Sequence, residues 1–361
     1  MNVEDVYANI QEQLDQELPF VVYKKAAKNQ LQCFLQQNDL WYELDDDFKS
    51  GFIFAPFDNA KKDVLIPLDK SVHYSVDITP GSIQKVNVFV DVEEDALDKQ
   101  ETKERHRLLV NKAIQNIKQG SIKKVVLSRK EEVKSPEANP LFIFKRLVEK
   151  YPKAFVYLWY HPKVGMWLGA TPETLLDVQN DQFSTMALAG TQAYQSNGDA
   201  TWDDKEIEEQ EIVTEFIVKA LSPISSNIIS SKTYTHRAGT LLHLRTDIKG
   251  DLNSEVSEIE NVIKVLHPTP AVCGLPKDEA KSFILRNEGY DRKFYTGFLG
   301  ELNIQSDKKT TSNLFVNLRC MEIEDQNISL YIGGGITKDS DPDKEWEETV
   351  RKTATMKNVL F

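Results

Sequence analysis

Residues 333–352 read GGGITKDSDPDKEWEETVRK, and they set a run of glycines between a strand-like segment, ISLYI, and a helix. A glycine turn leaves backbone N–H groups bare, and beside a helix N-terminus such groups can bind an anion. Ser340 or Asp341 suits the N-cap of the helix, and Pro342 suits its first position. The stretch therefore predicts an anion-binding turn followed by a helix over 341–359.

The helix over 341–359 carries three charged residues on one face. Glu345 and Glu348 are three residues apart, and Glu348 and Lys352 are four apart, so their side chains are neighbours. Two carboxylates, an ammonium group and an anion-binding turn suit a divalent cation that holds an anionic substrate. We therefore expect a ligand site here.

A second acidic pair, Glu206 and Glu209, lies on a predicted helix over 203–222. The pair continues an apolar stripe at helical spacing that should face the core and that consists of Val213, Phe216 and Ala220. Buried carboxylates need a cationic partner, either a metal ion or an arginine. Two helices that each direct Glu-x-x-Glu inward can supply the oxygen ligands of Mg²⁺.

Lys124 lies in the apolar segment KKVVLSR, which the alternation of side chains predicts as a strand. This alternation places Lys124 on the same face as Val126 and Ser128. A lysine here either extends its amine to solvent from the strand end or buries it. A buried amine loses its proton more easily and can then act as a general base.

Four further segments place polar residues beside small or apolar ones. Glu173 follows Thr171-Pro172 between two predicted strands, where it is either a surface turn residue or a general acid in a cleft. The next strand ends in a corner of small residues around Gly190, where backbone can approach a ligand. His243 and Arg319 lie in apolar strands, and a buried arginine needs an anionic partner.

Length, charge and cysteine content limit the class of protein. The chain has 361 residues, 40% hydrophobic and 28% charged, which is ordinary for a soluble globular protein. A net charge of −12 disfavours nucleic-acid and anionic-membrane partners, and no apolar run is long enough to predict a membrane span. Three widely spaced cysteines indicate reduced thiols, so we expect a cytoplasmic protein.

The order of predicted elements indicates an α+β fold. Residues 1–95 contain an opening helix and short strands with little recognisable chemistry, and residues 96–361 carry all the motifs above. In this second part strands mix with helices in irregular order, which suggests a sheet core covered by helices. Besides an amphipathic helix around Leu109 and Ile117, we predict helices over 139–150, 203–222, 255–266, 277–288 and 341–359.

Taken together, these segments resemble the chorismate-utilising enzymes, a family of isochorismate, salicylate, anthranilate and aminodeoxychorismate synthases. The resemblance runs from about residue 100 to the C-terminus. It rests on motifs in the family's order, namely KVVLSR, GATPE, LAGT, KEIEEQ, HLRTDIKG, LHPTPAVCG, YTGFLGE, NLRC, GGGI and EWEETVRK. The resemblance implies two packed, largely antiparallel sheets surrounded by helices, and a catalytic region over 96–361 that binds chorismate.

The family's pattern also implies a role for each matching residue. Glu209 and Glu348 would bind Mg²⁺ against the ring carboxylate of chorismate, supported by Glu206 and Glu345. The matching substrate contacts are Gly190, Thr191, His243, Tyr295, Arg319, Gly333, Gly335 and Lys352. No obligatory protein partner is implied.

Lys124 separates the members of the family. Members that add water resemble this chain in having lysine before VVLSR, whereas amine-adding members usually have glutamine there. The resemblance therefore implies an isochorismate synthase, in which Lys124 takes a proton from the attacking water at C2 and Glu173 protonates the departing C4 hydroxyl. The product could serve menaquinone, siderophore or salicylate synthesis.

Three alternatives stay open at this point. A salicylate synthase would also eliminate pyruvate from isochorismate in the same pocket. An aminating subunit would need a glutamine amidotransferase partner; Lys249 resembles a lysine of aminodeoxychorismate synthases, and Asp247 replaces a common proline. A protein that kept the fold without catalysis would be an anion-binding or interaction protein. A further departure is Gln210, where many relatives have histidine, and we expect it outside the set of metal ligands.

Overall fold

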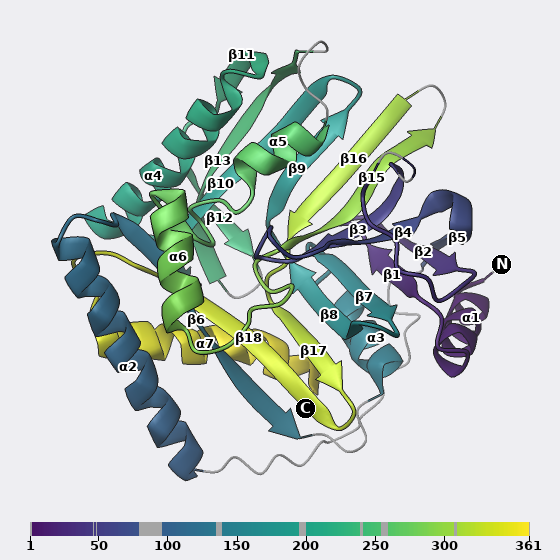
Figure 1. The fold of residues 1–361 in the computed structure, drawn as a ribbon, viewed down its shortest axis with the longest axis horizontal. Coiled ribbons are helices and arrows are strands. Elements are labelled where there is room, and N and C mark those ends of the chain that lie inside the picture. Colours follow the sequence, from purple (N-terminus) through teal and green to yellow (C-terminus); the bar gives the residue numbers. More distant parts are fainter. Residues whose placement is uncertain are drawn as a thin grey trace.

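The computed structural model describes residues 2–45, 47, 49–78, 96–134, 139–194, 200–238, 241–253, 259–306 and 309–360. Within these residues two nine-stranded sheets form the centre of the molecule, and every pairing between strands is antiparallel (Figure 1). The predicted α+β class with two packed antiparallel sheets is therefore confirmed.

The first sheet combines strands from both ends of the chain. In spatial order it consists of β14 (Gly274–Leu275), β6 (Lys124–Lys134), β18 (Asn327–Ile336), β17 (Cys320–Glu324), β8 (Gly165–Thr171), β7 (Phe155–His161), β1 (Phe20–Lys24), β2 (Gln30–Gln36) and β5 (Ser71–Asp77).

The second sheet is built in the same way. Its order is β11 (Ser225–Ser230), β13 (Leu241–Leu252), β10 (Gln182–Ala193), β9 (Thr174–Gln179), β16 (Lys309–Val316), β15 (Phe298–Ser306), β3 (Gly51–Ala55) and β4 (Val64–Pro67), with β12 (Tyr234–Ala238) also paired to β13. Strands from residues 20–77 thus enter both sheets, so this early part of the chain shares the core with the later part.

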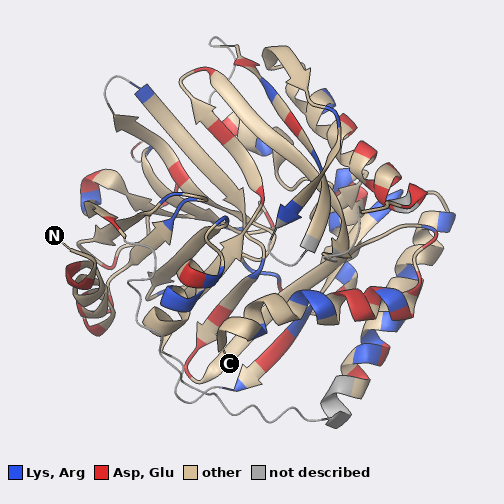
Figure 2. Cartoon of the chain, turned by 180° about the vertical axis from the view of Figure 1, so that it is seen from behind, with Lys and Arg blue, Asp and Glu red and all other residues tan. Residues whose placement is uncertain are grey.

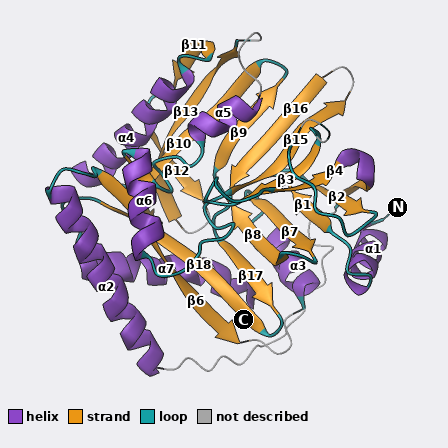
Figure 3. Cartoon of the chain, viewed as in Figure 1, coloured by secondary structure: helices purple, strands orange, loops and turns teal. Residues whose placement is uncertain are grey.

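Helices cover the outer faces of the sheets (Figure 3). The structure describes α1 (Val3–Asp15), α2 (Ala96–Lys118), α3 (Pro140–Lys150), α4 (Asp204–Leu221), α5 (Ile259–Leu266), α6 (Lys277–Asn287) and α7 (Pro342–Leu360), and a short 3-10 helix, η1 (Leu68–Lys70). The predicted helices agree with α3 to α7, although residues 255–258 of the helix expected over 255–266 lie outside the described part. The amphipathic helix around Leu109 is longer than expected, because the charged segment before it belongs to α2.

Aromatic side chains fill the space between the two sheets. Phe54 of the second sheet makes edge contacts with Trp159 and Trp167 of the first, at 5.0 and 6.0 Å between ring centroids. All three rings are fully buried. Aromatic rings bury a large apolar area each, so this cluster joins the sheets strongly.

Two helices position the motifs that carry charge. α4 packs on β10 and β13, and α7 packs on β18, α2 and α3. The Oδ1 atom of Asp341 accepts hydrogen bonds from the N–H groups of Asp343 and Lys344, both at 3.0 Å, so Asp341 is the N-cap of the two candidates, Ser340 and Asp341. Pro342 occupies the first helical position as expected.

Charged residues of both signs alternate along the outer helices, while most strands at the centre carry few (Figure 2). None of the helices in the described ranges combines the length and the apolar character that a bilayer crossing requires.

Candidate active site

One cavity of about 140 Å³ brings the predicted site residues together. On the same measure a single water molecule needs roughly 10–15 Å³, so the cavity has room for a small organic molecule. Both sheets, α4 and α7 contribute to its walls. Twelve of the fourteen predicted site residues line it: Glu173, Gly190, Thr191, Glu206, Glu209, His243, Tyr295, Arg319, Gly333, Gly335, Glu348 and Lys352. The other two, Lys124 and Glu345, are buried just behind the wall.

The glycine run differs from the prediction. It forms the end of β18 rather than a turn, and its residues pair with Val126, Leu127 and Ser128 of β6. The glycines matter because they have no side chains: a Cβ atom on Gly333 would lie 2.8 Å from the Tyr295 hydroxyl, and one on Gly335 would lie 2.5 Å from Oε1 of Glu209. The run therefore makes room for the side chains of Tyr295 and Glu209 at the cavity, and it is not the anion-binding turn that the sequence predicted.

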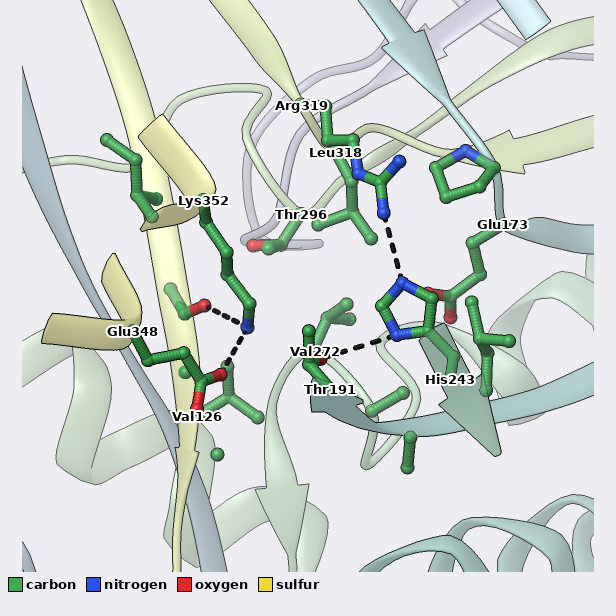
Figure 4. Close-up of a pocket in the computed structure, with 18 of the residues that line it drawn as sticks. Val126, Glu173, Thr191, His243, Val272, Thr296, Leu318, Arg319, Glu348 and Lys352 are labelled. Carbon is green, nitrogen blue, oxygen red and sulfur yellow. Dashed lines mark hydrogen bonds and ion pairs between the residues drawn. The ribbon is translucent and has the colours of Figure 1, made fainter. Parts of the chain in front are cut away.

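The charged face of α7 is arranged as the spacing predicted. The Nζ atom of Lys352 lies 2.7 Å from Oε1 of Glu348 and donates a hydrogen bond of 3.0 Å to the carbonyl oxygen of Gly333 (Figure 4). Glu345, one turn earlier, is buried, and its Oε2 atom would lie 3.5 Å from a Cβ atom on Gly334. The helix thus directs two carboxylates and one ammonium group toward the end of β18.

The acidic pair of α4 faces the same place from the other side. Glu206 and Glu209 are both partly buried and both line the cavity. Gln210, next to them, is turned away: its amide group donates hydrogen bonds to Thr246 at 2.6 Å and to Thr214 at 2.9 Å. It therefore supports the helix on β13 and is no candidate ligand.

Lys124 is fully buried, and its Nζ atom lies 2.8 Å from Oε1 of Glu209. It makes an ion pair there, without a directed hydrogen bond to any group in the described part of the chain. The reading in which its amine extends to solvent is wrong. The lysine lies behind Gly335 and Glu209, so Glu209 separates its amine from the cavity.

Glu173 lies between β8 and β9 and is only 5% exposed, so it is not a surface turn residue. Burial raises the pKa of its carboxyl group to about 7, although the positive charges of Lys124 and Arg319 oppose the shift. A carboxyl group that keeps its proton near neutral pH can donate it to a substrate.

His243 and Arg319 form the wall beside Glu173 (Figure 4). Arg319 Nη2 lies 3.0 Å from Nε2 of His243, and Nδ1 of His243 lies 2.9 Å from the carbonyl oxygen of Gly190. Since a guanidinium can only donate and a carbonyl can only accept, the imidazole is neutral and carries its proton on Nδ1. Burial also lowers the pKa of His243 to about 3, which agrees with this tautomer.

Arg319 precedes β17 at a φ of +48°, whereas the sequence placed it inside a strand. A non-glycine residue in the left-handed region is strained, and such residues gather at functional sites. Burial lowers the pKa of Arg319 to about 10, so it stays positively charged at neutral pH. It therefore offers a cation inside the cavity, on the side opposite Lys352.

The carboxylates of α4 and α7 are a chemically suitable set for Mg²⁺, which prefers oxygen ligands. Oxygen atoms of Glu209, Glu345 and Glu348 all lie close to the backbone of Gly334 and Gly335. Among the described residues no three acidic, histidine or cysteine side chains are close enough to hold a metal ion together. Glu209 and Glu348 instead each contact a lysine, so metal binding would require these two side chains to turn.

Several lining residues were not predicted as site residues. Val126, Val272 and Met356 lie within quoted motifs or one helical turn from Lys352, so spacing could have indicated them. Thr296 also lies within a quoted motif, YTGFLGE, but its backbone conformation could not be predicted from the sequence. Its φ of +60° is a rare conformation for a β-branched residue and follows from tertiary contacts.

Comparison with known proteins shows the family. The family model described as "Chorismate binding enzyme" matches residues 82–361. The chain therefore belongs to the chorismate-binding enzymes, and the family predicted from the sequence is confirmed.

Two similar members of the family are isochorismate synthases. The chain is 31% identical to isochorismate synthase MenF of Haemophilus influenzae over 254 residues, which are 68% of this chain and 58% of that protein. It is 30% identical to isochorismate synthase EntC of Escherichia coli over 287 residues, which are 77% of this chain and 71% of that protein.

A solved structure supports the fold. The menaquinone-specific isochorismate synthase MenF of Escherichia coli superimposes with a TM-score of 0.78 at 23% identity, over 95% of this chain and 89% of that one.

Proposed function

We propose that this protein is an isochorismate synthase that converts chorismate to isochorismate with Mg²⁺. The observation that carries the proposal is the buried Glu173, whose pKa is raised to about 7 in the same cavity as the cations Arg319 and Lys352. Chorismate carries two carboxylates, and the two cations on opposite sides of the cavity suit them. The isochorismate synthase names of the relatives support the same conclusion.

The protein has a net charge of −12, so binding an anionic substrate requires positive groups in the cavity. Arg319 is oriented by the neutral His243, and Tyr295 projects its hydroxyl toward Gly333. Lys352 lies across the cavity on α7, next to Glu348 (Figure 4). Mg²⁺ held by Glu209 and Glu348, with Glu206 and Glu345 beside them, would neutralise a ring carboxylate and orient it.

The reaction exchanges one hydroxyl group for another. Glu173 donates its proton to the C4 hydroxyl, which leaves as water, and a second water molecule adds at C2 and gives a proton to Lys124. The Lys124 amine lies 2.8 Å from the Glu209 carboxylate, which separates it from the cavity. Glu209 must therefore turn away before the amine can reach the water molecule. Water enters and leaves, so the overall change is an isomerisation.

A product assay tests the proposal. Purified protein is incubated with chorismate and Mg²⁺, and the products are separated by chromatography. We expect isochorismate. Unchanged chorismate from a folded preparation would overturn the proposal, and pyruvate with salicylate would select a salicylate synthase instead. An aminated product formed only with ammonium salts would indicate an aminating subunit.

A substitution at Lys124 tests its role as the base. Lys124→Gln keeps a polar side chain of similar length but cannot accept the proton, so water addition should fall by about 10²–10⁴-fold. The assay is repeated with ammonium chloride, because amine-adding members usually have glutamine here. Isochorismate formed at the wild-type rate would remove Lys124 as the base.

Two further features belong to the proposal. The three cysteines Cys33, Cys273 and Cys320 are free and buried, which supports the expected cytoplasmic location. We also infer, as the family resemblance implies, that the protein needs no obligatory protein partner.

A further inference from the structure

A buried ion pair outside the set of predicted site residues lies behind one wall of the cavity. Arg292 and Glu288 have side chains that are 2% and 1% exposed. Two parallel hydrogen bonds join them, from Nη2 to Oε1 at 2.5 Å and from Nε to Oε2 at 2.7 Å. Bidentate pairs of this kind fix the plane of the guanidinium group as well as its position.

The remaining hydrogen-bond donors of Arg292 all go to residues that line the cavity. Nη2 donates to the carbonyl oxygen of Val126 at 2.7 Å, and Nη1 donates to the carbonyl oxygen of Val272 at 3.0 Å and to Oγ1 of Thr296 at 3.1 Å. Val126, Val272 and Thr296 come from three separate segments of the chain. One guanidinium group therefore joins three parts of the same wall.

Glu288 extends this connection along β6. Its Oε1 atom accepts hydrogen bonds from the N–H group of Ser128 at 2.7 Å and from its hydroxyl at 3.0 Å. Ser128 in turn shares a hydrogen bond of 2.6 Å with the hydroxyl of Tyr290. Arg292 and Glu288 thus form hydrogen bonds with β6 at two residues, Val126 and Ser128. β6 is also the strand that carries Lys124.

The segment next to Arg292 is strained. Thr296 has a φ of +60°, and a β-branched residue in this region is energetically unfavourable. The conformation is kept by Arg292 on the side chain and by the hydrogen bond of 2.9 Å from its N–H group to the carbonyl oxygen of Asn317. The turn places Tyr295 so that its hydroxyl meets the bare backbone of Gly333.

We propose that Arg292, oriented by Glu288, is a positioning residue that sets the cavity wall formed by Val126, Val272, Tyr295 and Thr296. It acts through these residues and does not touch the substrate. The kinetic part of the inference rests on the proposed function, since it is measured as turnover of chorismate.

The test compares two buried ion pairs. Arg292→Lys keeps the charge but loses the planar fork, so it cannot bond Glu288 and both carbonyl groups together. The control is Glu301→Gln, which disturbs a buried carboxylate that binds Lys25 and Tyr23 and does not line the cavity. We expect Arg292→Lys to raise KM for chorismate about tenfold with a smaller change in kcat, because it displaces substrate contacts. The control should keep KM at the wild-type value, even at an equal loss of Tm.

A second measurement needs no substrate. Hydrogen exchange of the peptide over 289–298, followed by mass spectrometry, should become at least tenfold faster in Arg292→Lys and stay unchanged in Glu301→Gln. An unchanged KM and unchanged exchange in Arg292→Lys, or the same KM rise in the control, would overturn the inference. Should wild-type protein fail to convert chorismate, the proposed function falls, and the exchange measurement still decides the role of Arg292.

Discussion

Glu173 and Glu301 are both buried, with exposures of 5% and 7%, but they lie in different surroundings. The Glu301 carboxylate accepts a hydrogen bond from the hydroxyl of Tyr23 and pairs with Lys25 at 2.6 Å. The Glu173 carboxyl group makes no ion pair within the described part of the chain and faces the cavity. Lys25 balances the charge of the Glu301 carboxylate. The Glu173 carboxyl group instead becomes neutral by keeping a proton, because burial raises its pKa. Burial alone therefore does not distinguish a functional acid; its partners do.

The largest expected difference between Glu173 and Glu301 appears when each is replaced by glutamine. Glu173→Gln removes the proton donor and should lower kcat by about 10²–10⁴-fold, with Tm equal to or above that of the wild type. Glu301→Gln should do the reverse, with a lower Tm and nearly unchanged kcat, because it weakens a buried ion pair. Kinetics and thermal melts of both variants check this. Equal losses of activity in the two variants would contradict the comparison.

The pH dependence of stability should differ as well. The pKa of Glu173 is raised from 4.5 to about 7, so between these values the folded state keeps a proton that the unfolded state has lost. Stability is then lost as pH rises through this window, by about 3 kcal/mol in total. Glu173→Gln lacks this contribution. The unfolding free energy of the variant minus that of the wild type should therefore increase by about 3 kcal/mol from pH 4.5 to 7.5. Urea denaturation across this pH range measures the difference. Parallel curves of unfolding free energy against pH for the two proteins would contradict the raised pKa of Glu173.

A third setting is a cavity carboxylate that contacts a lysine, as Glu348 contacts Lys352. Glu348→Ala should raise the Mg²⁺ concentration required for half-maximal activity by on the order of ten- to a hundredfold, while the fold stays intact. Glu347→Ala is the matched control, since that side chain is 67% exposed on the same helix. Calorimetric titration with Mg²⁺ gives a second readout, and equal Mg²⁺ affinity in both variants would count against Glu348 as a ligand.

The smallest expected effect is on the pH profile of turnover. A general acid works only when protonated, so kcat/KM should fall tenfold per unit above a pH of about 7. The profile of Glu173→Gln should lack this limb and remain flat there. A falling limb that persists in the variant would assign the titration to another group.

Local patterns in the sequence predicted much of the fold and of the site. The helix expected over 341–359 is observed as Pro342–Leu360, with Glu345, Glu348 and Lys352 on one face. Helical periodicity is a property of neighbouring residues, so it can be recognised without knowing the contacts made by the rest of the chain. Most of the predicted site residues line one cavity, and this rests on the resemblance to a family more than on spacing.

The errors concern contacts between distant segments. The glycine run was read as a turn because glycine favours turns, but pairing with β6 extends β18 through it. Arg319 and Thr296 take left-handed conformations that only their tertiary contacts explain. The ion pair of Lys124 with Glu209 was not predicted either, because it joins β6 of the first sheet to α4, which packs on β10 and β13 of the second. No pattern within a single segment contains this information.

The interleaving of early and late strands has a consequence for synthesis on the ribosome. Phe20 of β1 pairs opposite Tyr160 of β7, and Gly51 of β3 pairs opposite Leu302 of β15. One edge of β1 therefore stays open until β7 is translated, and one edge of β3 stays open until β15 is translated near the end of the chain. Open strand edges favour wrong association. Nascent chains of this protein should depend on chaperones until the last sheet partners emerge.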